Sequence, residues 1–268
     1  MVVVTRVDRM GMSSINDLRN GLRELGQLAL LAREVFRGFI SGKVSRRDLI
    51  FQIYQIGVQS QSVVLVTGAF TGMVLFAQTY FQFHKVRMDT ATLAVVGVSM
   101  CSELGPVLTG LMVAGRVGAS LAAELGTMRV TEQIDALRTL ATHPVDYLVL
   151  PRVLATTLAM PILTGAAITV GIAAAYALGV FLLGVDPTYS WANMMRYTFS
   201  SHVLIGLIKS FIYGAQISLI SCYKGMNCGE GAEGVGRATT EAVVYSSITI
   251  LISNFFLTMF LSNLLQPG

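Results

Sequence analysis

Five long runs of apolar, nearly uncharged residues constrain the fold of this 268-residue chain more than any other feature. About 20 apolar residues cross a bilayer core, so each run suffices for one transmembrane helix. The third run, Val153–Val185, is too short for two helices and a turn, and we expect one long, tilted span through Gly184. The predicted fold is an all-α polytopic membrane protein with spans at about 50–83, 90–126, 147–184, 199–223 and 239–265.

Composition and charge agree with a membrane location. Only 13% of the residues are charged and 53% are hydrophobic, whereas a soluble domain is about 25% charged. Lys and Arg concentrate before the first span and in the segments 116–152 and 224–237, and few lie in the segments between them. This bias predicts a cytoplasmic N-terminus and a C-terminus on the outer side. The net charge of +4 then reflects membrane orientation, and we expect no nucleic-acid partner.

Residues 1–48 read as an N-terminal cytoplasmic domain built on a basic amphipathic helix. Ser13 or Ser14 would cap its start and Gly42 its end. We expect this helix to lie in the inner-leaflet interface, the alternative being a soluble helix packed on a partner. Its apolar stripe repeats at helical spacing: Ile15, Leu18, Leu22, Leu25, Ala29, Ala32, Phe36 and Phe39.

Glu103 lies near the centre of the second span. A carboxylate at bilayer depth costs roughly 2.5–3.5 kcal/mol on insertion scales, so its presence is a functional-site hypothesis, the alternative being a helix contact satisfied by a neighbouring span. Pro106 follows three residues later and lacks a backbone donor, which predicts a kink or opened turn beside the carboxylate. Lys209 lies about 14 Å along the fourth span and Glu103 about 20 Å along the second, which also runs inward. We hypothesise that the two charges pair, the alternative being that Lys209 snorkels to another polar site.

Two helix surfaces in the first two spans are candidates for packing and for ligand contact. Small residues recur every four positions in the second span, which favours close packing within the bundle or across a dimer; they are Gly110, Ala114, Gly118, Ala122 and Gly126. The outer half of the first span carries Leu75, Gln78, Gln82 and Phe83 close to one stripe. That mixed surface suits an acyl chain with a polar neighbour, or equally helix packing.

The loop after the second span predicts an amphipathic helix at about 128–142. Val130, Ile134, Leu137 and Ala141 would form its apolar face, and His143-Pro144 would end it. Its charged edge suits docking of a soluble partner, the alternative being a helix lying on the membrane. That edge consists of Arg129, Glu132, Gln133, Asp135 and Arg138.

Motifs of catalysis do not occur in the sequence. It contains no Gly-x-x-x-x-Gly-Lys-Ser/Thr phosphate loop, and its three histidines form no catalytic or metal-ligand pattern. We therefore predict no catalytic residue, no metal site and no cofactor bound by this chain. A transporter is expected rather than an enzyme.

Two sequence blocks resemble the MlaE/YrbE family of permeases, which are membrane subunits of ABC lipid transporters. The first runs from Glu103-Leu104-Gly105-Pro106 through Ala123-Glu124-Leu125-Gly126 to Ala136-Leu137. The second runs from Ile208-Lys209-Ser210 through Gly234-Val235-Gly236-Arg237 to Val244. The resemblance implies a permease domain over 49–268 in a bacterial inner membrane. It also implies a homodimer, a cytoplasmic ATPase pair that binds ATP and Mg, and an MCE-domain protein on the outer side.

The same resemblance implies a lipid pocket between the two subunits. By motif it points to Leu75, Gln78, Gln82, Phe83, Glu103 and Leu104, to which the pairing argument adds Lys209. Some relatives have Arg where this chain has Ser102, which bears on headgroup preference. Sequence physics alone also allows a second hypothesis, a proton-coupled secondary transporter of an amphiphile that uses Glu103 as the proton carrier.

Overall fold

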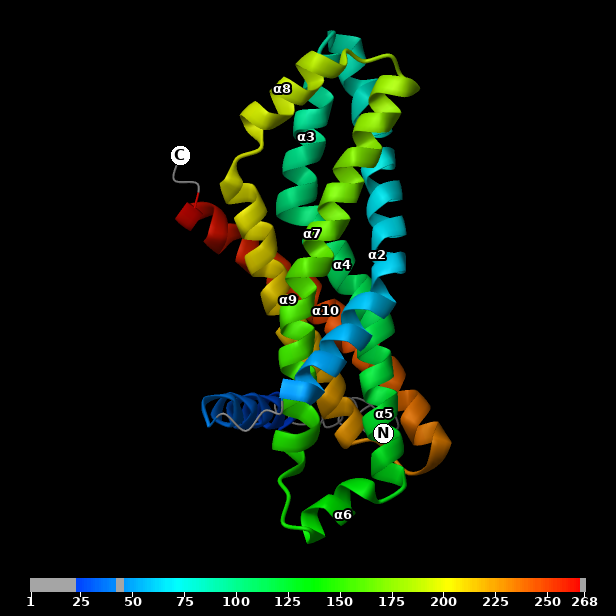
Figure 1. The fold of residues 1–268 in the computed structure, drawn as a ribbon, viewed down its shortest axis with the longest axis vertical. Coiled ribbons are helices and arrows are strands. Elements are labelled where there is room, and N and C mark those ends of the chain that lie inside the picture. The colour runs from blue at the N-terminus through cyan, green and yellow to red at the C-terminus, as the bar shows by residue number, and fades with distance from the viewer. Residues whose placement is uncertain (1–22, 42–45, 266–268) are drawn as a thin grey trace, which may run out of the picture.

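Five long helices form an elongated bundle in the computed structural model, which describes residues 23–41 and 46–265 (Figure 1). All five are long and apolar enough to cross a membrane, which confirms the predicted fold class. The first is α2 (Arg46–Phe83), the third includes α7 (Leu150–Phe181), and the last two are α9 (Ser200–Met226) and α10 (Gly231–Leu265). The third run is a single span, as expected, and it ends near Gly184, where φ is +67°.

The second span is a composite of three α-helical segments. These are α3 (Thr92–Ser99), α4 (Gly105–Val113) and α5 (Ala119–Val130), joined by π-turns at Met100–Leu104 and Ala114–Gly118. The first π-turn ends at Leu104, two residues before Pro106, which occupies the first turn of α4, where a missing N–H is tolerated. The opened turn predicted beside Glu103 is therefore confirmed, whereas the second π-turn had no sequence signal.

Close backbone contacts hold the spans together in two places. A Cβ built on Gly72 would lie 2.1 Å from Gly171 O of α7, and one on Gly68 would lie 2.7 Å from Ala167 O. On the other side of the bundle, a Cβ on Gly206 of α9 would lie 2.1 Å from Cys101 O. Only glycine permits these approaches, so α2 lies directly on α7 and α9 lies directly on the first π-turn.

The N-terminal helix, helical over residues 23–40, lies across the bundle near the end that carries the short helix α6 (Gln133–Thr139) (Figure 1). Val35 is buried and packs with Leu31 against the starts of α7 and the end of α9. Leu25, Phe36 and Phe39 of the predicted stripe are exposed, so the bundle is contacted by a different face. The exposed stripe remains available to a lipid interface. Ile15, Leu18, Leu22 and the proposed caps Ser13, Ser14 and Gly42 lie outside the described residues.

The prediction of one continuous helix over 128–142 was wrong. α5 continues to Val130, the chain turns at Glu132 with φ +58°, and a short helix, α6 (Gln133–Thr139), follows. Asp135 explains the turn, because it accepts from Arg129 at 2.8 Å and from Arg138 at 2.8 Å and so ties the two helices together. Ile134 is buried, while Val130 and Ala141 are exposed, so the apolar face is smaller than predicted.

Two further elements differ from expectation. α10 begins at Gly231, eight residues before the predicted start at 239. Its first turns are helical but polar, so the search for apolar runs did not detect them. Between the third and fourth spans lies α8 (Pro187–Tyr197), which the apolar runs did not reveal. Asp186 caps it by accepting from Tyr189 N at 2.9 Å, and α8 packs on α3 at the opposite end of the bundle from α6 (Figure 1).

Candidate functional site

Glu103 and Lys209 form an ion pair inside the bundle, which confirms the pairing hypothesis. Lys209 Nζ lies 2.7 Å from Glu103 Oε1, and Lys209 is fully buried. The two residues come from different spans, since Glu103 belongs to the first π-turn and Lys209 to α9. The pairing offsets the cost of placing each charge at this depth.

The fifth span completes the coordination of the pair. Thr258 Oγ1 accepts from Lys209 Nζ at 2.8 Å and lies 3.1 Å from Glu103 Oε1, to which it can donate. Asn254 Nδ2 donates to Glu103 Oε2 at 3.1 Å, and its own Oδ1 accepts from the Tyr213 hydroxyl at 2.8 Å. Sequence reasoning missed these three residues. Polar side chains four residues apart within an apolar span, as Asn254 and Thr258 are, could have identified two of them.

The π-turn contributes a backbone acceptor as well as the carboxylate. Lys209 Nζ donates to Ser102 O at 2.9 Å, while the Ser102 hydroxyl lies 3.1 Å from His202 Nδ1. A π-turn shifts the helical hydrogen-bond pattern, so a carbonyl beside it becomes available to a side chain. The ammonium thus has three oxygen partners, matching its three donors.

The two charges differ in exposure. The Lys209 side chain is 0% exposed, whereas the Glu103 side chain is 36% exposed. The site is therefore closed on the lysine side and open on the carboxylate side, where a polar group could approach. Among the residues that the structure describes, no group of three His, Cys, Asp or Glu side chains could hold a metal ion.

The other residues predicted for lipid contact are only partly brought together. Leu75 and Leu104 pack against one apolar cluster that also holds Phe76 and Met100. Gln78 and Gln82 are exposed, and Phe83 is half-buried. The described hydrogen-bond partners of Glu103 come from α9 and α10, so within one chain the carboxylate and these amides do not form one site.

The small-residue ridge packs inside the bundle. Ala114 and Ala122 are fully buried, and Gly110 lies against Ile250 of α10 and Tyr213 of α9. Gly118 lies against Ser221 and Ile217, and Gly126 against Val235. Of the predicted coupling residues, Arg129 and Arg138 both bind Asp135, whereas Glu132 and Gln133 are exposed at the α6 end.

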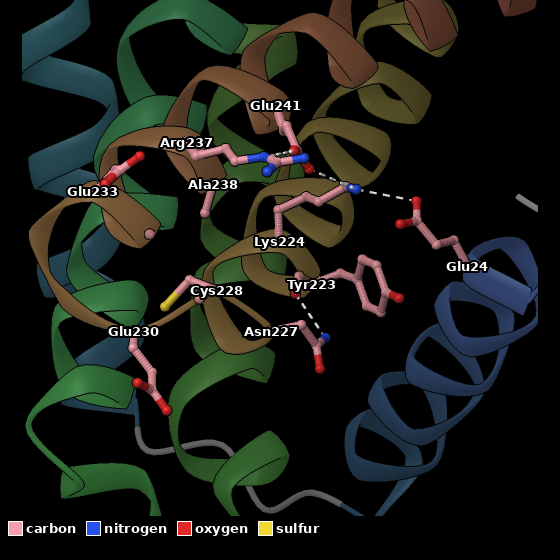
Figure 2. A pocket seen from close by; sticks show the side chains of 12 residues that line it. Glu24, Tyr223, Lys224, Asn227, Cys228, Glu230, Glu233, Arg237, Ala238 and Glu241 are labelled. Atoms are coloured by element: carbon pink, nitrogen blue, oxygen red, sulfur yellow. Dashed lines mark hydrogen bonds and ion pairs between the residues drawn. The ribbon is translucent and has the colours of Figure 1, made fainter. Parts of the chain in front are cut away.

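A polar pocket of about 420 Å³ lies where the N-terminal helix meets α9 and α10 (Figure 2). Lys224 points between Glu24 and Glu241 and binds each at 3.1 Å, and the Tyr223 hydroxyl donates to Gln27 at 2.6 Å. In the loop at its edge, burial raises the pKa of the Cys228 thiol, which therefore stays protonated at neutral pH. This cluster, which sequence reasoning missed, ties the N-terminal helix to the bundle.

Five helices that can span a membrane, with a buried ion pair between them, define a polytopic membrane protein. Residues 49–260 match the family profile described as permease MlaE, and the chain belongs to that family.

Relatives of known name agree. A probable ABC transporter permease protein of Rickettsia felis is 49% identical over 236 residues, which cover 88% of this chain and 91% of the relative. A probable ABC transporter permease protein of Synechocystis is 42% identical, covering 85% and 87% of the two chains. The intermembrane phospholipid transport system permease protein MlaE of Haemophilus influenzae is 36% identical, covering 78% and 81%.

Proposed function

We propose that this chain is the membrane subunit of an ABC transporter that moves phospholipid or a related lipid between the inner membrane and an MCE-domain partner. The observation that carries the proposal is the Glu103–Lys209 pair, closed on one side and open on the other. A permease for an amphiphile needs a polar contact at membrane depth beside apolar surface, and Leu104 supplies the latter next to Glu103.

Energy for transport comes from a separate subunit in this proposal. The sequence has no phosphate loop of its own, and relatives are named as ABC transporter permeases. ATP and Mg are bound by a cytoplasmic ATPase pair that contacts the α6 end, where Glu132, Gln133 and the Arg129–Asp135–Arg138 cluster lie. The name of the Haemophilus relative supports phospholipid as the cargo.

The assembly proposed is a homodimer in the bacterial inner membrane, with the N-terminus in the cytoplasm and the C-terminus outside. Dimerisation would bring the half-exposed Glu103 and the exposed Gln78 and Gln82 of the first span toward a common pocket between subunits. A carboxylate 36% exposed at bilayer depth is costly against lipid tails, so a covered, polar pocket is the environment that suits it.

Lipid transport in proteoliposomes tests the proposal. We expect transfer of a fluorescent phospholipid to require ATP and the co-reconstituted ATPase, and to persist when a protonophore abolishes the proton gradient. Glu103→Gln should reduce transfer, while the control Arg47→Gln, on the exposed start of α2, should not. Transfer that follows the proton gradient without ATP would instead establish the proton-coupled transporter.

A further inference from the structure

A second polar cavity lies away from the ion pair, between α2 and α5. It measures about 280 Å³. One wall carries three amides on one side of α2, namely Gln52, Gln55 and Gln59, at helical spacings of three and four. The facing wall carries Arg116 and Ser120 of the second span.

The cavity lies in the half of the bundle toward α6. α2 begins at Arg46, so Gln52 to Gln59 lie about 9–20 Å from its start at 1.5 Å per residue. The N-terminal helix crosses the bundle near that start (Figure 1). If this helix marks a membrane interface, the cavity occupies the depth of the headgroups, ester groups and upper acyl chains of one leaflet.

Within the described part of the chain, one positive charge in the cavity has no ion-pair partner. Glu124 also lines it, but Arg152 Nη2 binds that carboxylate at 3.3 Å. Among the described residues, no ion pair is found for Arg116, whose guanidinium offers five donors. Glu124 also accepts from the Ser120 hydroxyl at 3.4 Å, so its carboxylate is held on its own side of the cavity. The cavity therefore presents a guanidinium, several amides and this bound carboxylate to whatever fills it.

A buried hydroxyl gives independent evidence that a ligand belongs here. Ser60 lines the cavity, is only 2% exposed, and its Oγ has no hydrogen-bond partner in the described part of the chain. An unsatisfied buried hydroxyl costs about 1–3 kcal/mol, as mutational data on proteins indicate. Oγ has almost no accessible surface in the observed rotamer, so a polar ligand in the cavity would satisfy it after rotation of the Ser60 side chain toward the cavity.

We propose that this cavity binds the phosphate-bearing headgroup of a membrane phospholipid from the leaflet on the α6 side. Arg116 binds the phosphate, since guanidinium and phosphate make charge-assisted hydrogen bonds. The glutamine amides and Ser60 bind the ester and glycerol oxygens. The floor of Ile56, Val117 and Leu121 contacts the first methylenes of an acyl chain. The use of this site in transport rests on the proposed function, whereas binding itself does not.

Photo-labelling tests the site directly. The full-length protein is reconstituted in phosphatidylcholine vesicles with a minor share of phosphatidylglycerol that carries a diazirine beside its phosphate. No ATP and no ATPase are added. After illumination, mass spectrometry of peptides measures labelling of the segments 52–60 and 116–124, and separately of the segment around Glu103.

Arg116→Gln should lower labelling of the two cavity segments about tenfold, the loss expected for one charge-assisted contact, and Arg116→Lys should restore part of it. Labelling around Glu103 should stay unchanged, as should cavity labelling in the matched control Arg47→Gln. If Arg116→Gln does not fold, the double variant Gln55→Leu, Gln59→Leu provides the same test. Excess inorganic phosphate should not compete.

Three results would overturn the proposal. Cavity labelling equal in Arg116→Gln and the unaltered protein would show that no headgroup is bound there. Competition by inorganic phosphate would identify a free anion as the ligand. Efficient disulfide formation between two chains carrying Gln55→Cys would show that a second copy fills the cavity. Because transport is not measured, each of these results is independent of whether the chain transports lipid.

Discussion

Lys209 and Glu103 differ in how far each depends on the other for its hydrogen bonds. Lys209 is fully enclosed and depends on Glu103, Thr258 and Ser102 O for all its hydrogen bonds. Glu103 is 36% exposed and keeps Asn254 and Thr258 as partners when the lysine is absent. Removing the carboxylate therefore strands a buried ammonium, whereas removing the ammonium leaves a carboxylate that still has donors.

This asymmetry predicts unequal effects on stability. Glu103→Gln should destabilise the protein by about 3–5 kcal/mol, the usual cost of an uncompensated buried charge, and Lys209→Met should cost clearly less. Thermal unfolding of both purified variants in one detergent measures the order. Equal or reversed losses would contradict the burial difference as its cause.

Coupling between the charges should also appear in transport. In a double-mutant cycle of Glu103→Gln and Lys209→Met, each single change should reduce lipid transfer, and the double variant should lose much less than the product of the two effects. Residues in direct contact typically show coupling of about 0.5–3 kcal/mol. Additive losses within about 0.5 kcal/mol would mean that the pair does not act as a unit.

At this scale the sequence predicted the charges better than their surroundings. Depth along two spans was enough to suggest the Glu103–Lys209 pair, because charges at bilayer depth have few ways to be satisfied. The sequence could not predict that Gln78 and Gln82 lie apart from Glu103, because the face that a helix turns toward its neighbours depends on the packing of the whole bundle. Tyr213 was missed because a tyrosine in a span is common and gives no signal by itself.

Among the elements, the second span has the most demanding packing. Its ridge of small residues lies against α9 and α10. Gly225 of α9 also approaches this ridge closely, since a Cβ on Gly225 would lie 2.8 Å from Ala122 O. Such contacts let backbones approach without a hydrophobic driving force, which is absent between helices in lipid.

The ridge can be tested against a neighbour on the same turn. A Cβ on Gly118 would lie 2.9 Å from Ser221 Oγ, whereas one on Gly115 would meet nothing within 4 Å. Gly118→Leu should lower the free energy of unfolding by at least roughly 1–3 kcal/mol, the usual cost of overpacking. Gly115→Leu should lower it little or not at all. Ala122→Leu, at a fully buried position, should behave like Gly118→Leu. Thermal unfolding of the three variants measures these losses of stability. A similar loss for Gly115→Leu would indicate that the backbone of the π-turn, rather than packing, is the cause.

Element boundaries were the weaker part of the sequence interpretation. The break before α6 depends on a left-handed Glu132, a conformation that glutamate seldom adopts and that no local signal announces. The Arg129–Asp135 contact that stabilises it spans six residues and is visible only in the fold. The early start of α10 escaped because apolarity marks the membrane-embedded part of a helix and not its polar extension.

On the scale of the whole molecule, one end of the bundle gathers most of the charged contacts. The N-terminal helix, α6, and the junction of α9 with α10 all lie toward that end (Figure 1). The other end carries α8, whose exposed Tyr189, Trp191 and Tyr197 suit a membrane interface. The two ends therefore present different chemistry to their partners.

A substitution at Glu132 should test ATPase docking at the α6 end without disturbing the fold. Glu132→Lys should weaken association with the ATPase in a pull-down, because its exposed carboxylate makes no described contact that the fold needs. Asp135→Lys should also weaken association, but it breaks the ties to Arg129 and Arg138 and should lower the melting temperature as well. Normal ATPase recovery with Glu132→Lys, Asp135→Lys together would refute this end as the docking surface.

Lys224 should control how firmly the N-terminal helix is held. Lys224→Met removes its contacts to Glu24 and Glu241, and should increase amide hydrogen exchange in residues 23–40. Arg237→Met, which removes only a contact within α10, is the matched control. Unchanged exchange in Lys224→Met would mean that the Tyr223–Gln27 hydrogen bond and the apolar contacts of Leu31 and Val35 are sufficient.

The π-turn at Met100–Leu104 has a consequence for sequence length. A π-turn holds one residue more than an α-turn, so it takes up one extra residue while the helical segments on its two sides keep nearly the phase of a single α-helix. Deleting one residue there would close the turn and leave α3 free to keep its contact between Gly97 and Met194 of α8. The change would fall on the residues of the turn itself, which include Ser102 and Glu103. A single deletion here should therefore disturb the ion pair while sparing the packing of the segments on either side.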